Sequence, residues 1–330
     1  MAGGQERILR RRIKTVQATK KITRAMELIA ASRIVKAQAK VNAAKPYSEK
    51  LTDVIANLSA AGAGADQPLL RVPEQVERTA YVVVTADRGL AGGYNNNILR
   101  LTERTIKAEQ RDGRGYSLIT IGKKARGYFS FRNFDIAHSF EGFSDAPTYA
   151  DAKEVAETAV AQFIDGEVQK VNLVFTRFLS LGTQVPEIVP FVPLDVSAVG
   201  ADEPAEEGGI AADYEYEPSP DGILGSLLPR YAEAKLYAAL LEAAASEHAA
   251  RQRAMKAATD NADDLITTLS RIMNRARQDA ITTEIMEIVG GAEALRQAGG
   301  ASGTDDMLDA TQDLLLDQVT PQSIAPRIGG

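Results

Sequence analysis

Two long stretches, one near each end of the chain, lack the residues that normally stop a helix. The first covers residues 6–58, with no glycine and one proline, Pro46. The second starts near "SPDGILGSLLPRY" and runs to about Val289, with Gly290 and Gly291 near its end. Glycine and proline are the poorest residues in a helix interior. At ~1.5 Å per residue these stretches predict helices of about 80 Å and about 90 Å, the first bent or interrupted near Pro46.

The apolar residues of these stretches fall on narrow stripes. In "RQRAMKAATDNADDLITTL", steps of three and four separate Met255, Ala258, Ala262, Leu265 and Leu269, and Ile272 and Ala276 continue the series. In the first stretch one helical face can hold Leu9, Ile13, Val16, Met26, Ala30, Ala37, Val41 and Ala44. Such spacing is typical of a coiled coil. Because only these two helices are long enough to pair with each other, we expect an antiparallel coiled coil within one chain.

The middle of the chain has a different pattern. β-Branched runs of strand length occupy 79–86, 116–122 and 171–178, and helix-like segments occupy 94–111, 123–131 and 149–165. "PEIVPFVPLDV" resembles an edge strand. Alternation of strands and helices predicts a parallel sheet covered on both faces, hence a Rossmann-like α/β domain inserted between the two long helices. The predicted boundaries are 1–60 for the first helix, 61–200 for the α/β domain, 201–221 for an acidic linker and the segment after it, 222–295 for the second helix and 296–330 for a separate tail.

Composition excludes several kinds of chemistry. The chain has 330 residues, of which 45% are hydrophobic and 25% charged, as in soluble folded proteins. It has no cysteine, and its two histidines, His138 and His248, lack ligand-like spacing, so we expect no metal site and no cofactor. No apolar run approaches the ~18 residues of a membrane span. We therefore expect a protein that is cytosolic or lies on a cytosolic membrane face.

Positive charge is concentrated at the N-terminal end. Residues 1–40 contain eleven lysines and arginines against two acids, Glu6 and Glu27. A solvated helix face is the simplest interpretation, and an acidic partner or a nucleic acid is the alternative. The formal net charge of −6 and the lack of interleaved aromatic residues favour an acidic protein over a nucleic acid.

A glycine-rich turn, "TADRGLAGGYNNNI", follows the first strand and opens a helix. Such a turn can present backbone N–H groups to a phosphate, but neither G-x-x-x-x-G-K-[ST] nor G-x-G-x-x-G is present. Asp87, Gly89, Gly92 and Gly93 would serve a tight turn equally well. No Ser/His/Asp set can be assembled, and adjacent carboxylates such as Asp263 and Asp264 point in different directions on a helix. Nothing in the sequence resembles an active site.

Three long motifs occur in order: "IKTVQATKKITRAMELIAASRIVKAQ", "DRGLAGGYNNNI" and "RQRAMKAATDNADDLITTLSRIMNRARQDAITTEIMEIVGGAEAL". Together they resemble the gamma subunit of the F-type ATP synthase over most of residues 4–295. The resemblance implies a rotor shaft, present in one copy per complex, inside a ring of alpha and beta subunits. It implies an α/β domain resting with the epsilon subunit on the c-ring. It also implies a non-catalytic subunit of a proton-transporting ATPase, peripheral to the cell membrane on its cytoplasmic side, without a cofactor or a bound nucleic acid.

The resemblance also carries over residue roles. It implies contacts to the acidic loop of a beta subunit by Lys20, Lys21, Arg24 and Met26. Polar contacts to beta are implied for Arg277, Gln278 and Thr282. "DYEYEP" resembles the family's foot segment, the part of the subunit that faces the c-ring. The resemblance therefore implies contacts on the c-ring and epsilon side by Tyr214, Tyr216 and Glu217. The sequence departs from the family at Ala91, where cysteine is common, and in its tail after Leu295.

Two other functions remain open from sequence. A stand-alone nucleotide-binding α/β enzyme would use the glycine turn and would bind ATP or a dinucleotide as the isolated chain. A coiled-coil scaffold would form a homodimer through the long helices. Neither explains why separate motifs of one family appear together and in order.

Overall fold

The computed structural model of the chain describes residues 2–60, 63–64, 67–194 and 219–298. It forms two compact units. The larger unit spans residues 15–266, and the smaller one combines residues 2–14 with residues 267–298. The predicted acidic insertion 201–212 and the tail from residue 299 onward lie outside the described residues.

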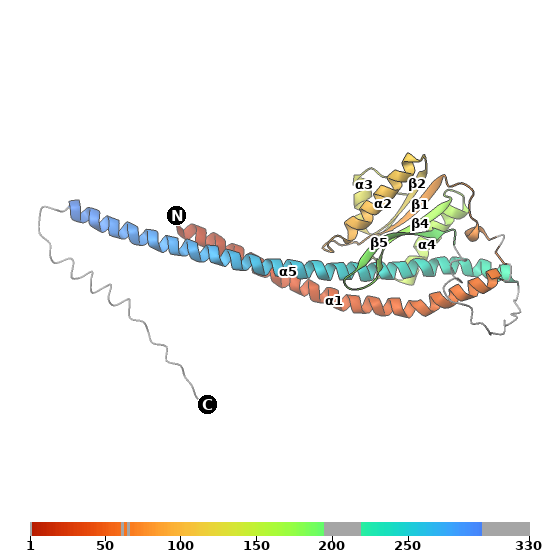
Figure 1. Cartoon of the computed structure of the whole chain (residues 1–330), viewed down its shortest axis with the longest axis horizontal. Coiled ribbons are helices and arrows are strands. Elements are labelled where there is room, and N and C mark those ends of the chain that lie inside the picture. The colour runs from red at the N-terminus through yellow and green to blue at the C-terminus, as the bar shows by residue number, and fades with distance from the viewer. Residues whose placement is uncertain (1, 61–62, 65–66, 195–218, 299–330) are drawn as a thin grey trace, which may run out of the picture. The chain divides into compact units, whose positions relative to one another are not determined.

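The two long helices are α1, Ala2–Ala60, and α5, Pro220–Ala298. Of the bend or interruption predicted near Pro46, the interruption does not occur, because α1 continues through Pro46, and Figure 1 shows the helix curved. α5 begins before its predicted start, contains Pro229 and passes through Gly290 and Gly291. Glycine weakens a helix by only about 1 kcal/mol relative to alanine and keeps its backbone hydrogen bond, so a glycine pair does not have to end one.

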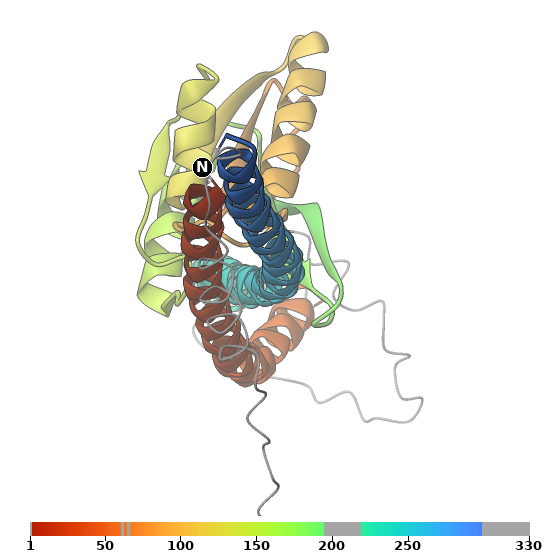
Figure 2. The ribbon, with the colours of Figure 1, turned by 90° about the vertical axis from the view of Figure 1, so that its left-hand side faces the viewer.

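Within the larger unit, α1 and α5 lie side by side and antiparallel (Figures 1 and 2). Lys20 pairs with Asp263, and Thr23 with Thr259. Farther along, Leu58 of α1 shares a core cluster with Leu224 of α5. Residue numbers thus rise in one helix as they fall in the other. The pairing joins two helices of one chain, as the intramolecular coiled coil requires, and it differs from the pairing of a homodimeric scaffold.

The buried stripe of α5 differs from the predicted one at alternate positions. Met255, Ala262 and Leu269 are buried as expected. The intervening buried position is Thr259, not Ala258, and Leu265 and Ile272 are exposed. A stripe chosen by hydropathy misses Thr259 because a threonine is buried here against another threonine.

The sheet has five strands: β1 Arg78–Val84, β2 Gly115–Ile121, β3 His138–Phe140, β4 Lys170–Phe178 and β5 Gln184–Val192. Their order is β3-β2-β1-β4-β5, with β5 antiparallel to β4 and the other pairs parallel. A short 3₁₀ helix, η1 Pro68–Leu70, precedes β1. The three predicted strands and the predicted edge strand are confirmed. β3 was not predicted because three residues are too few to show a pattern.

Helices cover both faces of the sheet. α2 Tyr94–Arg111 and α3 Lys123–Phe131 pack on one face, against Tyr81 and Val83 of β1. α4 Tyr149–Ile164 packs with α1 and α5 on the other, against Val82 and Val84. Successive residues of a strand point to opposite faces, which explains the alternation. The chain runs outward from β1 through β2 to β3 and then returns to place β4 on the other side of β1, so the strand order reverses between the neighbours β1 and β4, as at the switch point of a Rossmann-like sheet.

Candidate functional site

The predicted basic cluster lies on α1 where it meets α5. Lys20 and Arg24 both have partners within the chain: Lys20 pairs with Asp263, and Arg24 donates to both carboxylate oxygens of Glu27 at 2.9 Å. Lys21 is exposed. These ion pairs sit at the surface, where their net contribution to stability is small, so the charges remain usable by a partner.

Met26 is half-buried and lines a cavity of about 350 Å³. The opposite wall is the glycine-rich turn, through Arg88, Gly89 and Leu90. Leu90 adopts a positive φ of 64° and is 63% exposed, and Ile29 beside Met26 is also exposed. The structure therefore brings together two motifs that the sequence keeps apart. Ile29 and Leu90 join the candidate surface, and no signal in the sequence alone identifies them.

At the start of the glycine-rich turn, nearby backbone N–H groups are hydrogen-bonded to side chains of the turn and of the helix that follows it. Asp87 accepts hydrogen bonds from the backbone N–H groups of Lys123, Gly142 and Ser144, at 2.9–3.2 Å. Burial by itself raises the pKa of Asp87, but these hydrogen bonds outweigh it and the pKa is lowered. The N–H of Ala86 donates to Asn95 Oδ1. The donors around Asp87 are thus used within the chain, which weakens the case for a nucleotide at this end of the turn.

A buried ionic network fastens this turn to the helix pair. Arg251 of α5 donates to Glu247, which is 1% exposed, and to the carbonyl of Gly89 at 3.5 Å. Burial raises the pKa of Glu247, and Arg251 offsets this in part. Asp145, which precedes α4, pairs with Arg33 of α1.

His248 completes the network and is 2% exposed. Its Nε2 lies 3.0 Å from the carbonyl oxygen of Asp145 and must donate to it, and Arg251 donates to Nδ1 at 3.3 Å. This arrangement suits a neutral imidazole, because a proton on Nδ1 would face the guanidinium. Burial lowers the pKa of His248, the Asp145 carbonyl opposes this, and Arg251 and Arg33 lower it further.

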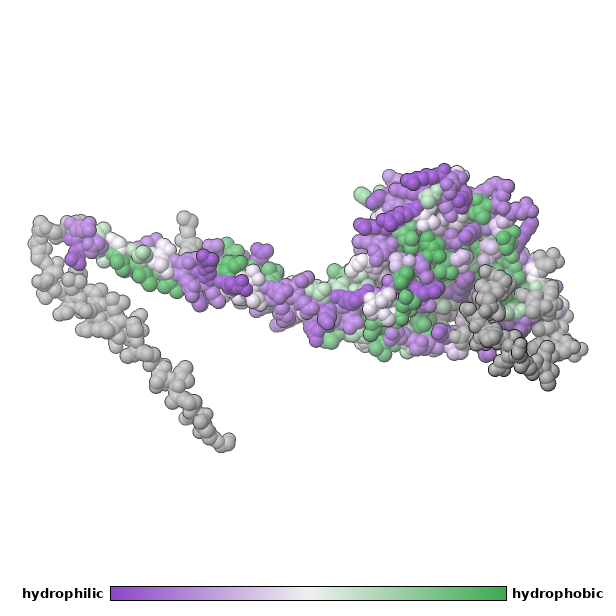
Figure 3. Space-filling view, in the orientation of Figure 1, coloured by the Kyte–Doolittle hydropathy of each residue, from purple (hydrophilic) through white to green (hydrophobic). Residues whose placement is uncertain are grey.

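The smaller unit carries the other predicted contacts to beta. Arg277, Gln278 and Thr282 are exposed on α5, and the Thr282 hydroxyl donates to the Gln278 carbonyl at 3.0 Å. Figure 3 shows apolar surface (green) on this part of the helix. The large apolar side chains exposed here are Ile281, Ile285, Met286, Ile288, Val289 and Leu295. Exposed apolar residues in such number mark an interaction surface.

The predicted foot residues Tyr214, Tyr216 and Glu217 lie outside the described residues. Within the described ranges, no cluster of three or more side chains is arranged to hold a metal ion. Over the same ranges, no helix is both long enough and apolar enough to cross a bilayer.

The fold defines a class of proteins in which the two end helices pair and a Rossmann-like domain is inserted between them. A solved ATP synthase of Euglena gracilis contains a chain that matches with a TM-score of 0.64 at 18% identity, covering 92% of this chain and 99% of that one. Residues 5–295 match the family model described as ATP synthase. The ATP synthase gamma chain of Frankia casuarinae is 52% identical over 91% of this chain and 99% of its own length, and that of Kineococcus radiotolerans is 47% identical over 90% and 98%. The chain belongs to the ATP synthase gamma-chain family.

Proposed function

We propose that the chain is the rotor shaft of an F-type ATP synthase, transmitting torque between a membrane c-ring and catalytic beta subunits. One observation carries the mechanism: the α/β domain is fastened to both long helices by the buried network of Glu247, His248 and Arg251 and by the Arg33–Asp145 pair. A rotor needs such a joint, because torque applied to the domain must turn the helices instead of being lost at a hinge.

Each of the two units supplies residues to the proposed partner contacts. The alpha and beta subunits surround the helices, the acidic loop of beta faces Lys20, Lys21, Arg24 and Met26, and beta also contacts Arg277, Gln278 and Thr282. The exposed apolar side chains from Ile281 to Leu295 bear on the inside of the ring. The c-ring and the epsilon subunit contact the side that includes Tyr214, Tyr216 and Glu217.

This assignment gives the chain no catalytic residues of its own. ATP forms in the beta subunits, and the chain controls which of them binds, converts or releases nucleotide. We place it at the cytoplasmic side of the cell membrane as a peripheral subunit, in one copy per complex.

Reconstitution with alpha and beta subunits tests the proposal. Assembly with one copy of the chain should give ATP hydrolysis, and the double variant Arg277→Ala/Gln278→Ala should assemble but turn over about tenfold more slowly, a change of ~1.4 kcal/mol in barrier. Arg271→Ala, an exposed arginine on the same helix, is the matched control and should stay within about twofold. Equal turnover by the unaltered chain, the double variant and Arg271→Ala would show that Arg277 and Gln278 do not contribute to the contact with beta. Failure of the unaltered chain to assemble would reject the rotor assignment.

A further inference from the structure

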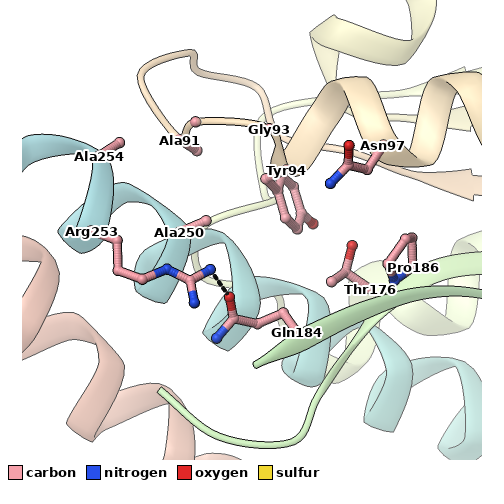
Figure 4. Close-up of a pocket in the computed structure, with 11 residues that line it drawn as sticks. Ala91, Gly93, Tyr94, Asn97, Thr176, Gln184, Pro186, Ala250, Arg253 and Ala254 are labelled. Carbon is pink, nitrogen blue, oxygen red and sulfur yellow. Dashed lines mark hydrogen bonds between the residues drawn. The ribbon is translucent and has the colours of Figure 1, made fainter. Parts of the chain in front are cut away.

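A second cavity lies at the carboxyl ends of β1 and β4. It has a volume of about 320 Å³, and its walls come from the start of α2, from β4 and β5, and from Ala250, Arg253 and Ala254 of α5 (Figure 4). In open α/β sheets, ligands bind in the crevice at the carboxyl ends of the strands at the switch point. In this chain Ala250, Arg253 and Ala254 of α5 form one wall of that crevice, and the cavity is the space that remains between α5 and the sheet.

One side chain of this cavity lacks a hydrogen-bond partner. Thr176 is 4% exposed, and among the described residues nothing bonds to its hydroxyl oxygen. Figure 4 shows that oxygen directed into the cavity, towards Tyr94 and Asn97. Buried hydroxyl groups nearly always bond to the protein or to an ordered water, so an unpaired one directed into a cavity marks a place for a water or a small polar ligand.

The charge of the cavity selects an anion. Among the described residues that line it, Arg253 is the one charged residue and none carries a carboxylate. Arg253 donates through its Nη atoms to the carbonyls of Leu181 and Gly182 and to Gln184 Oε1. A guanidinium has five N–H donors, so these bonds leave donors available.

The first turn of α2 adds to the positive potential. The N–H of Tyr94 donates to the Ala91 carbonyl at 3.2 Å, but the N-cap residue, Gly93, has no side chain to cap the N–H groups that follow. A helix N-terminus attracts anions through these N–H groups and the helix dipole. A Cβ at Gly93 would approach Asn97 Nδ2 at 3.4 Å, so the backbone comes close to the Asn97 amide, a further donor.

We propose that this cavity binds inorganic phosphate. Arg253 and the α2 N-terminus balance the charge, and the Thr176 hydroxyl and the Asn97 amide each donate to a phosphate oxygen. The bound anion joins α2, β4 and α5, so it strengthens the attachment of the sheet to the long helix. This inference is independent of the rotor assignment, because it requires only the fold of the larger unit.

The test is a ³¹P NMR titration of inorganic phosphate with the purified full chain. Arg253→Gln should weaken binding by about tenfold, and Thr176→Val, which removes only the hydroxyl, by about threefold. Thr79→Val is the matched control, because the Thr79 hydroxyl is also buried without a partner but does not line the cavity. It should bind phosphate as the unaltered chain does.

Three results would overturn the proposal: no phosphate binding, equal binding by all variants, or tighter binding of malonate, a dicarboxylate of similar size, than of phosphate. Arg253 also holds residues 181–184, so its substitution can disturb the fold. Thr176→Val breaks no hydrogen bond of its side chain, so an unchanged affinity in that variant is decisive.

Discussion

The hydroxyl groups of Thr23 on α1 and Thr259 on α5 lie 2.8 Å apart and form a buried hydrogen bond across the helix pair. Each hydroxyl has a single hydrogen, so one threonine donates across the pair while the other donates to a carbonyl of its own helix, Lys20 for Thr23 or Met255 for Thr259. The pair marks the register of the two helices, because sliding one helix along the other would separate the two hydroxyls.

A double-mutant cycle measures this register contact. Thr23→Val and Thr259→Val should each lower the free energy of unfolding by about 1 kcal/mol. The double variant should lose less than the sum of the two, because the contact is removed only once. Chemical denaturation provides the four values, and strict additivity would show that the hydroxyls do not interact.

The Glu247–Arg251 pair should be the most sensitive charge contact in the network. Arg251→Met leaves a buried carboxylate without its cation and should cost about 3–5 kcal/mol. Replacing both residues, as in Glu247→Leu/Arg251→Met, should recover much of that loss.

The loss in Arg251→Met should depend on pH. Burial raises the pKa of Glu247 in the folded chain. A protonated Glu247 therefore adds to the free energy of unfolding at pH values below the unfolded pKa, and this contribution is lost as pH rises through the folded pKa. Denaturation at acidic and at alkaline pH should therefore show the larger defect at the alkaline end. A defect that does not change with pH would contradict this role for Glu247.

His248 should make stability fall on acidification. Its pKa is lowered in the folded chain from 6.5, so its contribution is complete above that value and is lost as pH falls through the folded pKa. The groups facing it are Asp145, Arg33 and Arg251. His248→Gln should flatten this part of the stability curve.

Gly122 should not tolerate a side chain. It has φ of +90°, and a Cβ there would lie 2.3 Å from the carbonyl oxygen of Thr85. We expect Gly122→Ala to cost about 3 kcal/mol or more, through steric overlap and backbone strain. Gly142 also has a positive φ but open space around it, so Gly142→Ala should cost only about 1–2 kcal/mol. Thermal unfolding of both variants measures the two losses of stability. A larger loss for Gly122→Ala is the cost of the steric overlap, and equal losses in the two variants would argue against that overlap.

The long helices, three central strands and shorter helices were predictable because their signals are local. Depletion of glycine and proline, steps of three and four, and β-branched runs can each be recognised within one segment. The second helix was predicted over 222–295, past Gly290 and Gly291, and α5 spans Pro220–Ala298, so only the last few residues at each end differ.

The candidate sites were less accessible from sequence, because their parts are far apart along the chain. His248 meets Asp145 across 103 positions, and Arg33 meets the same residue across 112. Burial of Thr259 depends on Thr23, 236 positions away. The unpaired hydroxyl of Thr176 is visible only once β4, α2 and α5 are assembled. Contacts of this kind follow from tertiary packing, which no local pattern encodes.

The most direct test of the rotor assignment is to watch the chain turn. It has no cysteine, so Ser130→Cys, at an exposed position on α3 of the α/β domain, would provide a single labelling site. The labelled chain would be assembled with alpha and beta subunits, the complex immobilised through beta, and a probe on the label followed during ATP hydrolysis. The rotor assignment predicts stepwise rotation in one direction that stops when ATP is withdrawn. Sustained hydrolysis with a stationary probe on an assembled complex would contradict it.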